Sequence, residues 1–238
     1  MRRADARAIT ALFRSQHGVA SRSQLRLHGV TAEVERTRVS PGEWDRPTAG
    51  IVRAVAARPT PEQALMIALL VAGPGAVASH ESAAWLWDLA PAPERPAVTI
   101  RTTRRHRAGP FVIHRLKGPA PEPFQHRGFP VTNPLRTLVD LAGVVSSNEI
   151  DEAVDRALAT KLLTVEAIQA EVGRLSRHGR KGTGAMRRAL ARRGLVEGPS
   201  PSVLEARFHR LLKMAGITPV ATEVVAGPEG QFRVDTLI

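Results

Sequence analysis

The sequence contains no cysteine and no tyrosine, and only 4% of its 238 residues are aromatic. The absence of cysteine excludes disulfides and any zinc site with cysteine ligands, and it is typical of proteins in a reducing compartment. With so few rings, the core must consist mainly of leucine, valine and alanine, for which a hydrophobic share of 43% is sufficient. The longest apolar run, Ala64 to Gly73, is far shorter than the roughly 20 residues that a membrane-spanning helix needs.

The first residues do not form the pattern of a secretory signal. Met1–Arg7 includes three arginines but no apolar stretch. We therefore expect a cytoplasmic protein that has no membrane partner.

Acidic residues and lysine are also scarce. Asp and Glu total 22 against 34 basic residues, which gives a formal net charge of +12, and only four of the basic residues are lysine. An arginine-rich surface favours polyanions, since arginine binds phosphate and guanine bidentately. A GC-rich coding sequence also raises the arginine content, so composition leaves both explanations open.

Caps and strand patterns predict a protein of the α+β class. Thr60-Pro61-Glu62-Gln63 has the pattern of a helix start, with a capping residue followed by proline at the first helical position. Further helices are expected over 79–87, 134–141, 146–160, 164–175 and 203–214, and strands over 97–100, 111–114, 220–225 and 231–235. We expect these elements to divide the chain into four segments: a winged helix-turn-helix (1–58), a middle α/β domain (59–142), a helical connector with a basic linker (143–197) and an endonuclease-like fragment (198–238).

Residues 17–55 are the most informative part of the chain. The stretch 18–25 reads as a turn and a capped helix, and 29–39 reads as a turn and a second short helix. Residues 41–46 and 50–53 then form the pattern of a small hairpin. Helix, turn, helix and hairpin in this order predict a winged helix-turn-helix, which places its second helix in the DNA major groove.

The predicted DNA-binding residues lie on these two helices and on the hairpin. Arg36 is the best candidate for contacts to bases, because it lies on the second helix and is expected to face outward. The remaining candidates are Arg22, Gln24, Thr31, Arg38 and Arg46. Each arginine could also be an ordinary solvated residue, and the acids Glu33 and Glu35 in the same helix would repel phosphate.

The stretch Arg174–Arg193 contains eight basic residues and no acid. Its glycine-rich part, 179–184, predicts a mobile basic linker that could touch nucleic acid non-specifically. His80-Glu81 begins like a zinc-protease helix, but Ala84 stands where the second histidine would be needed. We expect Trp85 and Trp87 to be packing residues.

Three ordered segments resemble a known family: 18–25 (GVASRSQL), 79–84 (SHESAA) and 130–142 (PVTNPLRTLVDLA). They are similar to actinobacterial proteins with an AbiEi-type antitoxin N-terminal domain. These are winged-helix proteins related to the antitoxins of type IV toxin–antitoxin and abortive-infection systems. The resemblance implies a transcriptional regulator that binds double-stranded DNA at its own promoter.

Residues 202–208 and 233–235 resemble the start of a module related to very-short-patch-repair endonucleases, which have a restriction-endonuclease-like core. The resemblance implies that Glu205 and Asp235 occupy two acidic positions of a magnesium site. A further acidic group expected about ten residues later is missing, as in a truncated reading frame, so the catalytic set is incomplete. Glu205 is equally well explained by a capping box with Ser202.

The sequence thus favours a DNA-binding regulator of the AbiEi antitoxin type that acts by occupying an operator and needs no cofactor. The alternatives are a DNA endonuclease of the very-short-patch-repair-like class, which is incomplete in this chain, and an antitoxin that binds only protein. The resemblance implies a cognate toxin as a second partner, which the residues leave open. A homodimer is also open, because helix-turn-helix proteins often pair to bind two half-sites.

Overall fold

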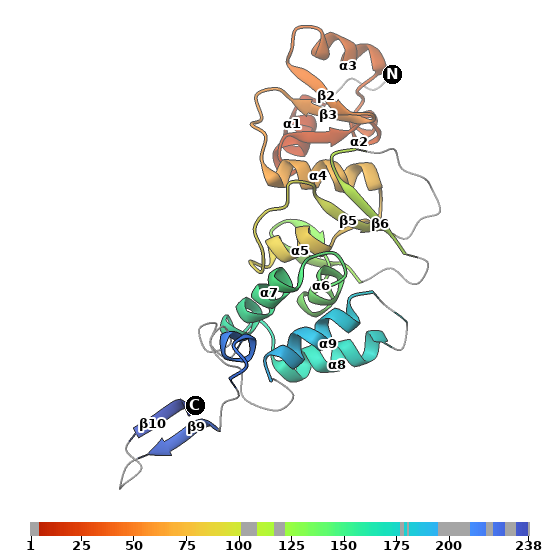
Figure 1. The fold of residues 1–238 in the computed structure, drawn as a ribbon. Helices are drawn as coiled ribbons and strands as arrows, with labels where there is room; N and C mark the ends of the chain where they lie inside the picture. Colours follow the sequence, from red (N-terminus) through yellow and green to blue (C-terminus); the bar gives the residue numbers. More distant parts are fainter. Residues whose placement is uncertain are drawn as a thin grey trace. The chain divides into compact units, whose positions relative to one another are not determined.

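The chain contains both helices and strands, partly in consecutive runs of strands and of helices, which confirms the α+β class (Figure 1). The computed structural model describes residues 5–100, 109–116, 122–176, 179, 181–194, 210–217, 221–226 and 232–237, the last two ranges as backbone only. The chain divides into two compact units, Met1–Leu141 and Ala142–Ile238. In the part of the chain that the structure describes, no helix has both the length and the apolar character needed to cross a membrane.

The first unit begins with short helices whose starts are set by side-chain caps. The elements are α1 (Ala6–Ser15), β1 (Val19–Ser21), α2 (Arg22–Leu27), α3 (Ala32–Val39), β2 (Trp44–Thr48) and β3 (Ile51–Ala54). Ser21 and Gln24 form a complete capping box at α2. The Thr31 hydroxyl accepts a hydrogen bond of 3.2 Å from the Val34 amide and caps α3.

The hairpin β2–β3 belongs to a three-stranded antiparallel sheet of order β1-β3-β2. Strand β1, which the sequence pattern does not predict, pairs with β3 from Val19 opposite Arg53 to Ser21 opposite Ile51. Beneath the sheet, Phe13 of α1 packs against Trp44 with ring centroids 5.3 Å apart. This core fixes α1, α2, α3 and the hairpin as one body.

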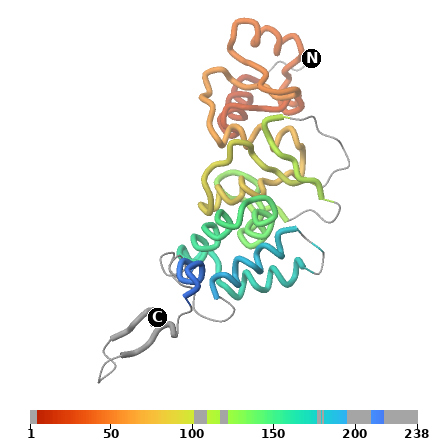
Figure 2. The backbone as a smooth tube through the Cα atoms, viewed as in Figure 1, coloured from red at the N-terminus to blue at the C-terminus, as the bar shows by residue number. Residues whose placement is uncertain are grey.

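Helix α4 (Pro61–Ala72) lies between this sheet and a second one, and packs against strands of both. In Figure 2 the chain runs from the segment α1–β3 (red to orange) into α4. The helix is apolar nearly all round because both sides are covered. Val19 and Ile51 share a core cluster with Leu65 of α4, so the packing continues through the boundary expected between residues 58 and 59.

The second sheet has five strands in the order β6-β5-β4-β8-β7, with β4–β8 and β5–β6 parallel and the other pairs antiparallel. Its elements, with the helices beside it, are β4 (Val77–Ala78), α5 (His80–Leu86), β5 (Ala97–Ile100), β6 (Val112–Arg115), β7 (Phe124–His126), β8 (Phe129–Val131) and α6 (Pro134–Leu141). His80 is buried at the start of α5 and stacks on His114 at 3.5 Å between centroids. Trp87 donates its indole N–H to the Thr132 carbonyl over 2.9 Å, so it packs within the unit.

The second unit contains α7 (Ser147–Ala159), α8 (Val165–Ser176), α9 (Thr183–Arg192), a helical stretch at 210–214, and a hairpin of β9 (Ala221–Ala226) and β10 (Phe232–Leu237). The prediction of a basic linker over 179–184 is wrong for its last two residues, because Thr183 and Gly184 belong to α9. Gly182 precedes the helix with φ +94°, a left-handed conformation that suits glycine. Burial of Thr183 and Met186 then holds the first turns of α9 in place.

Candidate nucleic-acid interface

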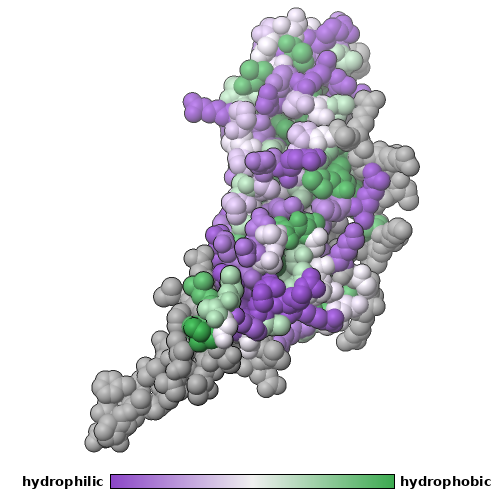
Figure 3. All heavy atoms as spheres, viewed as in Figure 1, coloured by the Kyte–Doolittle hydropathy of each residue, from purple (hydrophilic) through white to green (hydrophobic). Residues whose placement is uncertain are grey.

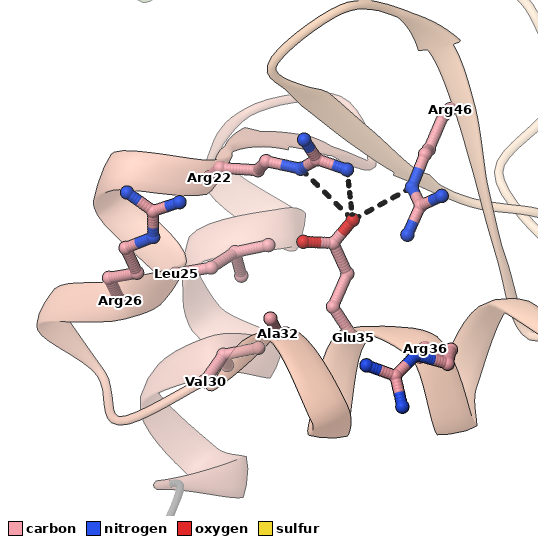
Figure 4. A pocket seen from close by; sticks show the side chains of 8 residues that line it. All are labelled: Arg22, Leu25, Arg26, Val30, Ala32, Glu35, Arg36 and Arg46. Atoms are coloured by element: carbon pink, nitrogen blue, oxygen red, sulfur yellow. Dashed lines mark hydrogen bonds and ion pairs between the residues drawn. The ribbon is translucent and has the colours of Figure 1, made fainter.

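A buried acid in α3 brings two of the predicted arginines together. Glu35 is 7% exposed, and a single carboxylate oxygen, Oε1, accepts hydrogen bonds from both Arg22 and Arg46. The distances are 3.0 Å from Nε and 2.7 Å from Nη2 of Arg22, and 2.8 Å from Nε of Arg46. Arg22 begins α2 and Arg46 lies in β2, so this contact ties α2 and the hairpin to α3 (Figure 4).

The surroundings keep Glu35 charged. Burial alone raises the pKa of the Glu35 carboxyl, but hydrogen bonds from Arg22 and Arg46 and the attraction of their charges outweigh burial, so the pKa lies below its ordinary value. The charge of Glu35 is thus surrounded by two guanidinium groups within the protein, a setting that the sequence-based expectation of phosphate repulsion did not include. A sequence signal for its burial exists: Glu35 lies four residues before Val39 and so shares its face of the helix.

Around Glu35 the surface encloses a cavity of about 220 Å³ between α2, α3 and the hairpin. Four arginines and one acid line it, with a net charge of +3, together with Leu25, Val30 and Ala32; the charged residues are Arg22, Arg26, Arg36, Arg46 and Glu35. Figure 4 shows that these arginines come from three different elements, α2, α3 and β2, and that Arg22 and Arg46 converge on Glu35. Arg26 is absent from the sequence-based set, although its position four residues after Arg22 places both on one face of α2.

Arg36, the predicted base-contacting residue, is exposed on α3. Among the described residues, none forms a hydrogen bond or ion pair with its side chain, which leaves its five N–H donors available to a ligand. Glu33 is also exposed, in the first turn of α3. In the view of Figure 3, hydrophilic side chains alternate with small apolar groups over the end of the first unit that carries α3 and the hairpin.

The other predicted residues have local partners. Gln24 accepts a hydrogen bond of 2.8 Å from the Ser21 amide, and Thr31 caps α3, so both side chains stabilise helix starts. Arg38 pairs with Glu43 at 2.7 Å, and its guanidinium lies 5.8 Å from the centre of the Trp44 ring. The salt bridge of Arg38 thus connects α3 to the start of the hairpin, while half of the Arg38 side chain remains exposed.

Three arginines of the basic stretch Arg174–Arg193 are paired with acids of their own unit. Arg193 is buried and binds Asp155 at 2.7 Å and Asp151 at 2.5 Å, and Arg192 binds Asp151 at 3.0 Å. Arg174 pairs with Glu171 at 2.6 Å. Internal carboxylates therefore neutralise these three arginines, whereas the contact of the linker 179–184 with nucleic acid stays a prediction.

The acids of the predicted endonuclease-like fragment are not brought into a described site. Glu205 lies outside the described residues, and Asp235 lies in β10, where the structure describes only the backbone. Within the ranges whose side chains are described, no group of three or more His, Asp or Glu lies close enough to hold a metal ion.

No protein-family model matches the chain, and no curated protein matches it. Among solved structures, the chain is similar to the crystal structure of the RV2827C protein from Mycobacterium tuberculosis. The TM-score is 0.53 at 18% sequence identity, and the match covers 94% of this chain and 86% of that one. At this identity the likeness concerns the fold alone.

Proposed function

We propose that this protein is a double-stranded DNA-binding transcriptional regulator of the AbiEi antitoxin type, which acts in the cytoplasm by occupying an operator, without catalysis. The order α1, β1, α2, α3, β2, β3 supports the proposal of a winged helix-turn-helix, in which α3 is the recognition helix and β2–β3 is the wing. The observation that carries the proposal is the position of four arginines around one cavity at the junction of α2, α3 and the hairpin.

The roles of the arginines follow from their elements. Arg36 is exposed on the recognition helix, where side chains meet base edges in the major groove, and a guanidinium matches the O6 and N7 acceptors of guanine. Arg22 at the helix start and Arg46 on the wing are at positions that contact phosphate in this class of domain. Arg26 adds a fourth charge to the same rim.

The endonuclease-like alternative has weaker support. It depends on Glu205 and Asp235, and the described side chains include neither of them. A cognate toxin remains part of the proposal only through the family resemblance, and a homodimer only because helix-turn-helix proteins often pair to bind two half-sites. The charged cavity in the first unit, by contrast, is a feature of the described structure and favours an anionic partner.

The experiment is a titration of the full-length protein against the duplex upstream of its own gene and against a shuffled duplex of equal length and composition, at several salt concentrations. We expect tighter binding to the upstream duplex. With Arg22, Arg26 and Arg46 as about three phosphate contacts, the logarithm of the binding constant should fall with the logarithm of salt at a slope of about −3. Equal, weak affinity for both duplexes would contradict sequence-specific regulation.

A further inference from the structure

The Glu35 carboxylate lies in the middle of the arginines that are proposed to contact DNA. An acid at this place weakens phosphate binding if charge alone matters, because like charges repel. Yet Glu35 is buried in α3 and accepts hydrogen bonds from Arg22 and Arg46 on the same oxygen. Repulsion of phosphate therefore does not explain why an acid is buried between these two arginines.

Two guanidinium groups within 3.0 Å of one oxygen atom repel each other unless a negative charge lies between them. Glu35 supplies that charge and fixes two long side chains that otherwise sample many rotamers. The side chains of Arg22 and Arg46 are still 37% and 44% exposed. Because Glu35 occupies Nε and Nη2 of Arg22 but only Nε of Arg46, the remaining N–H groups have no partner among the described residues and are available to a ligand.

We propose that Glu35 is a positioning residue: its carboxylate holds Arg22 of α2 and Arg46 of the wing as a two-arginine clamp for a phosphate of the DNA backbone. This inference rests on the proposed function. It makes the clamp a preorganised site, since the rotamer entropy of both arginines is lost on folding and not on binding. It also explains how an acid in the recognition helix is compatible with DNA binding.

The test compares Glu35→Gln with Glu33→Gln in the full chain. Both substitutions remove one negative charge from α3, but only Glu35 holds arginines. We expect Glu35→Gln to weaken binding of the upstream duplex by about five-fold to ten-fold, because the freed arginines then lose their rotamer freedom on binding. Glu33→Gln should bind as well as the unchanged protein or more tightly. If Glu35→Gln also binds more tightly, Glu35 acts only as a repelling charge and the inference is overturned.

A second measurement does not depend on DNA. NMR signals of the arginine Nε–H groups, followed during a titration with inorganic phosphate, report on the clamp in the unchanged protein. We expect the Arg22 and Arg46 signals to be protected from exchange and to shift together at the same phosphate concentration, and Glu35→Gln to remove both effects. Unprotected signals, or signals that phosphate does not shift, would overturn the inference even if Glu35→Gln does not fold.

The two measurements distinguish a failure of the clamp from a failure of the proposed regulator function. If phosphate shifts both arginine signals but the unchanged protein binds no duplex, the clamp stands and the proposed regulator function is overturned. If the duplex binds while Arg22 and Arg46 do not respond to phosphate, the function stands and the clamp is overturned.

Discussion

At the scale of single residues, the partners of each arginine separate structural roles from binding roles. Arg38 is paired with Glu43, and Arg193 is buried against two aspartates, whereas Arg36 is exposed and has no partner among the described side chains. Arg22 and Arg46 are intermediate, because each is held by Glu35 and partly exposed. In the first unit, Glu35 therefore fixes Arg22 and Arg46 in position, whereas no described residue fixes Arg36.

The stability of the first unit should depend on pH through Glu35. Its pKa is lower in the folded chain than in the unfolded chain, so its contribution to folding is fully present above about pH 4.3, the ordinary glutamate value. The contribution is lost as the pH falls through the lower, folded value. Since both arginines are more than a third exposed, solvent screening limits the loss in Glu35→Gln to about 1–2 kcal/mol at pH 7.

Urea unfolding followed by tryptophan fluorescence measures this effect, because Trp44, Trp85 and Trp87 all lie in the first unit. The difference in unfolding free energy between the unchanged protein and Glu35→Gln should shrink steadily below about pH 4. A difference that stays constant from pH 7 to pH 3 would show that the Glu35 charge does not contribute.

At the scale of elements, the sequence predicted most helices well, because their caps are local. The starts of α2, α4 and α7 follow from Ser21, Thr60 and Ser146, whose side chains accept from the backbone three residues later. Strand β1 was missed because three residues are too few for an alternating pattern, and its pairing partner β3 lies about thirty residues away. The pairing of Glu35 with Arg22 and Arg46 was missed for the same reason, since no local spacing rule links three elements.

The cap of α3 gives a prediction at this scale. Thr31→Ala removes the hydroxyl that accepts from the Val34 amide, and should destabilise the first unit by about 1 kcal/mol. Hydrogen exchange at the Val34 amide should accelerate accordingly. Thr37→Ala, on the exposed side of the same helix, is the control and should change stability by less than about 0.5 kcal/mol. Equal effects of the two substitutions would mean that the cap does not hold α3.

At the scale of the whole molecule, the basic residues behind the formal net charge of +12 have different surroundings in the two units. In the second unit, Asp151 and Asp155 of α7 neutralise arginines at the end of α9, and Arg210 lies 3.4 Å from Asp155. In the first unit, the cavity between α2, α3 and the hairpin has a net charge of +3. The net charge alone does not locate this cavity, whereas the acids that pair with the second unit's arginines distinguish those arginines from the ones that line it.

The central claim is that α3 reads DNA sequence through Arg36, and one comparison tests it most directly. The affinities of Arg36→Ala and Arg156→Ala for the upstream and shuffled duplexes are measured at one salt concentration; both arginines are exposed, and Arg156 lies on α7 of the second unit. We predict that Arg36→Ala loses about 1–3 kcal/mol of the preference for the upstream duplex, while Arg156→Ala keeps that preference. An unchanged preference in Arg36→Ala, or an equal loss in both variants, would contradict the account.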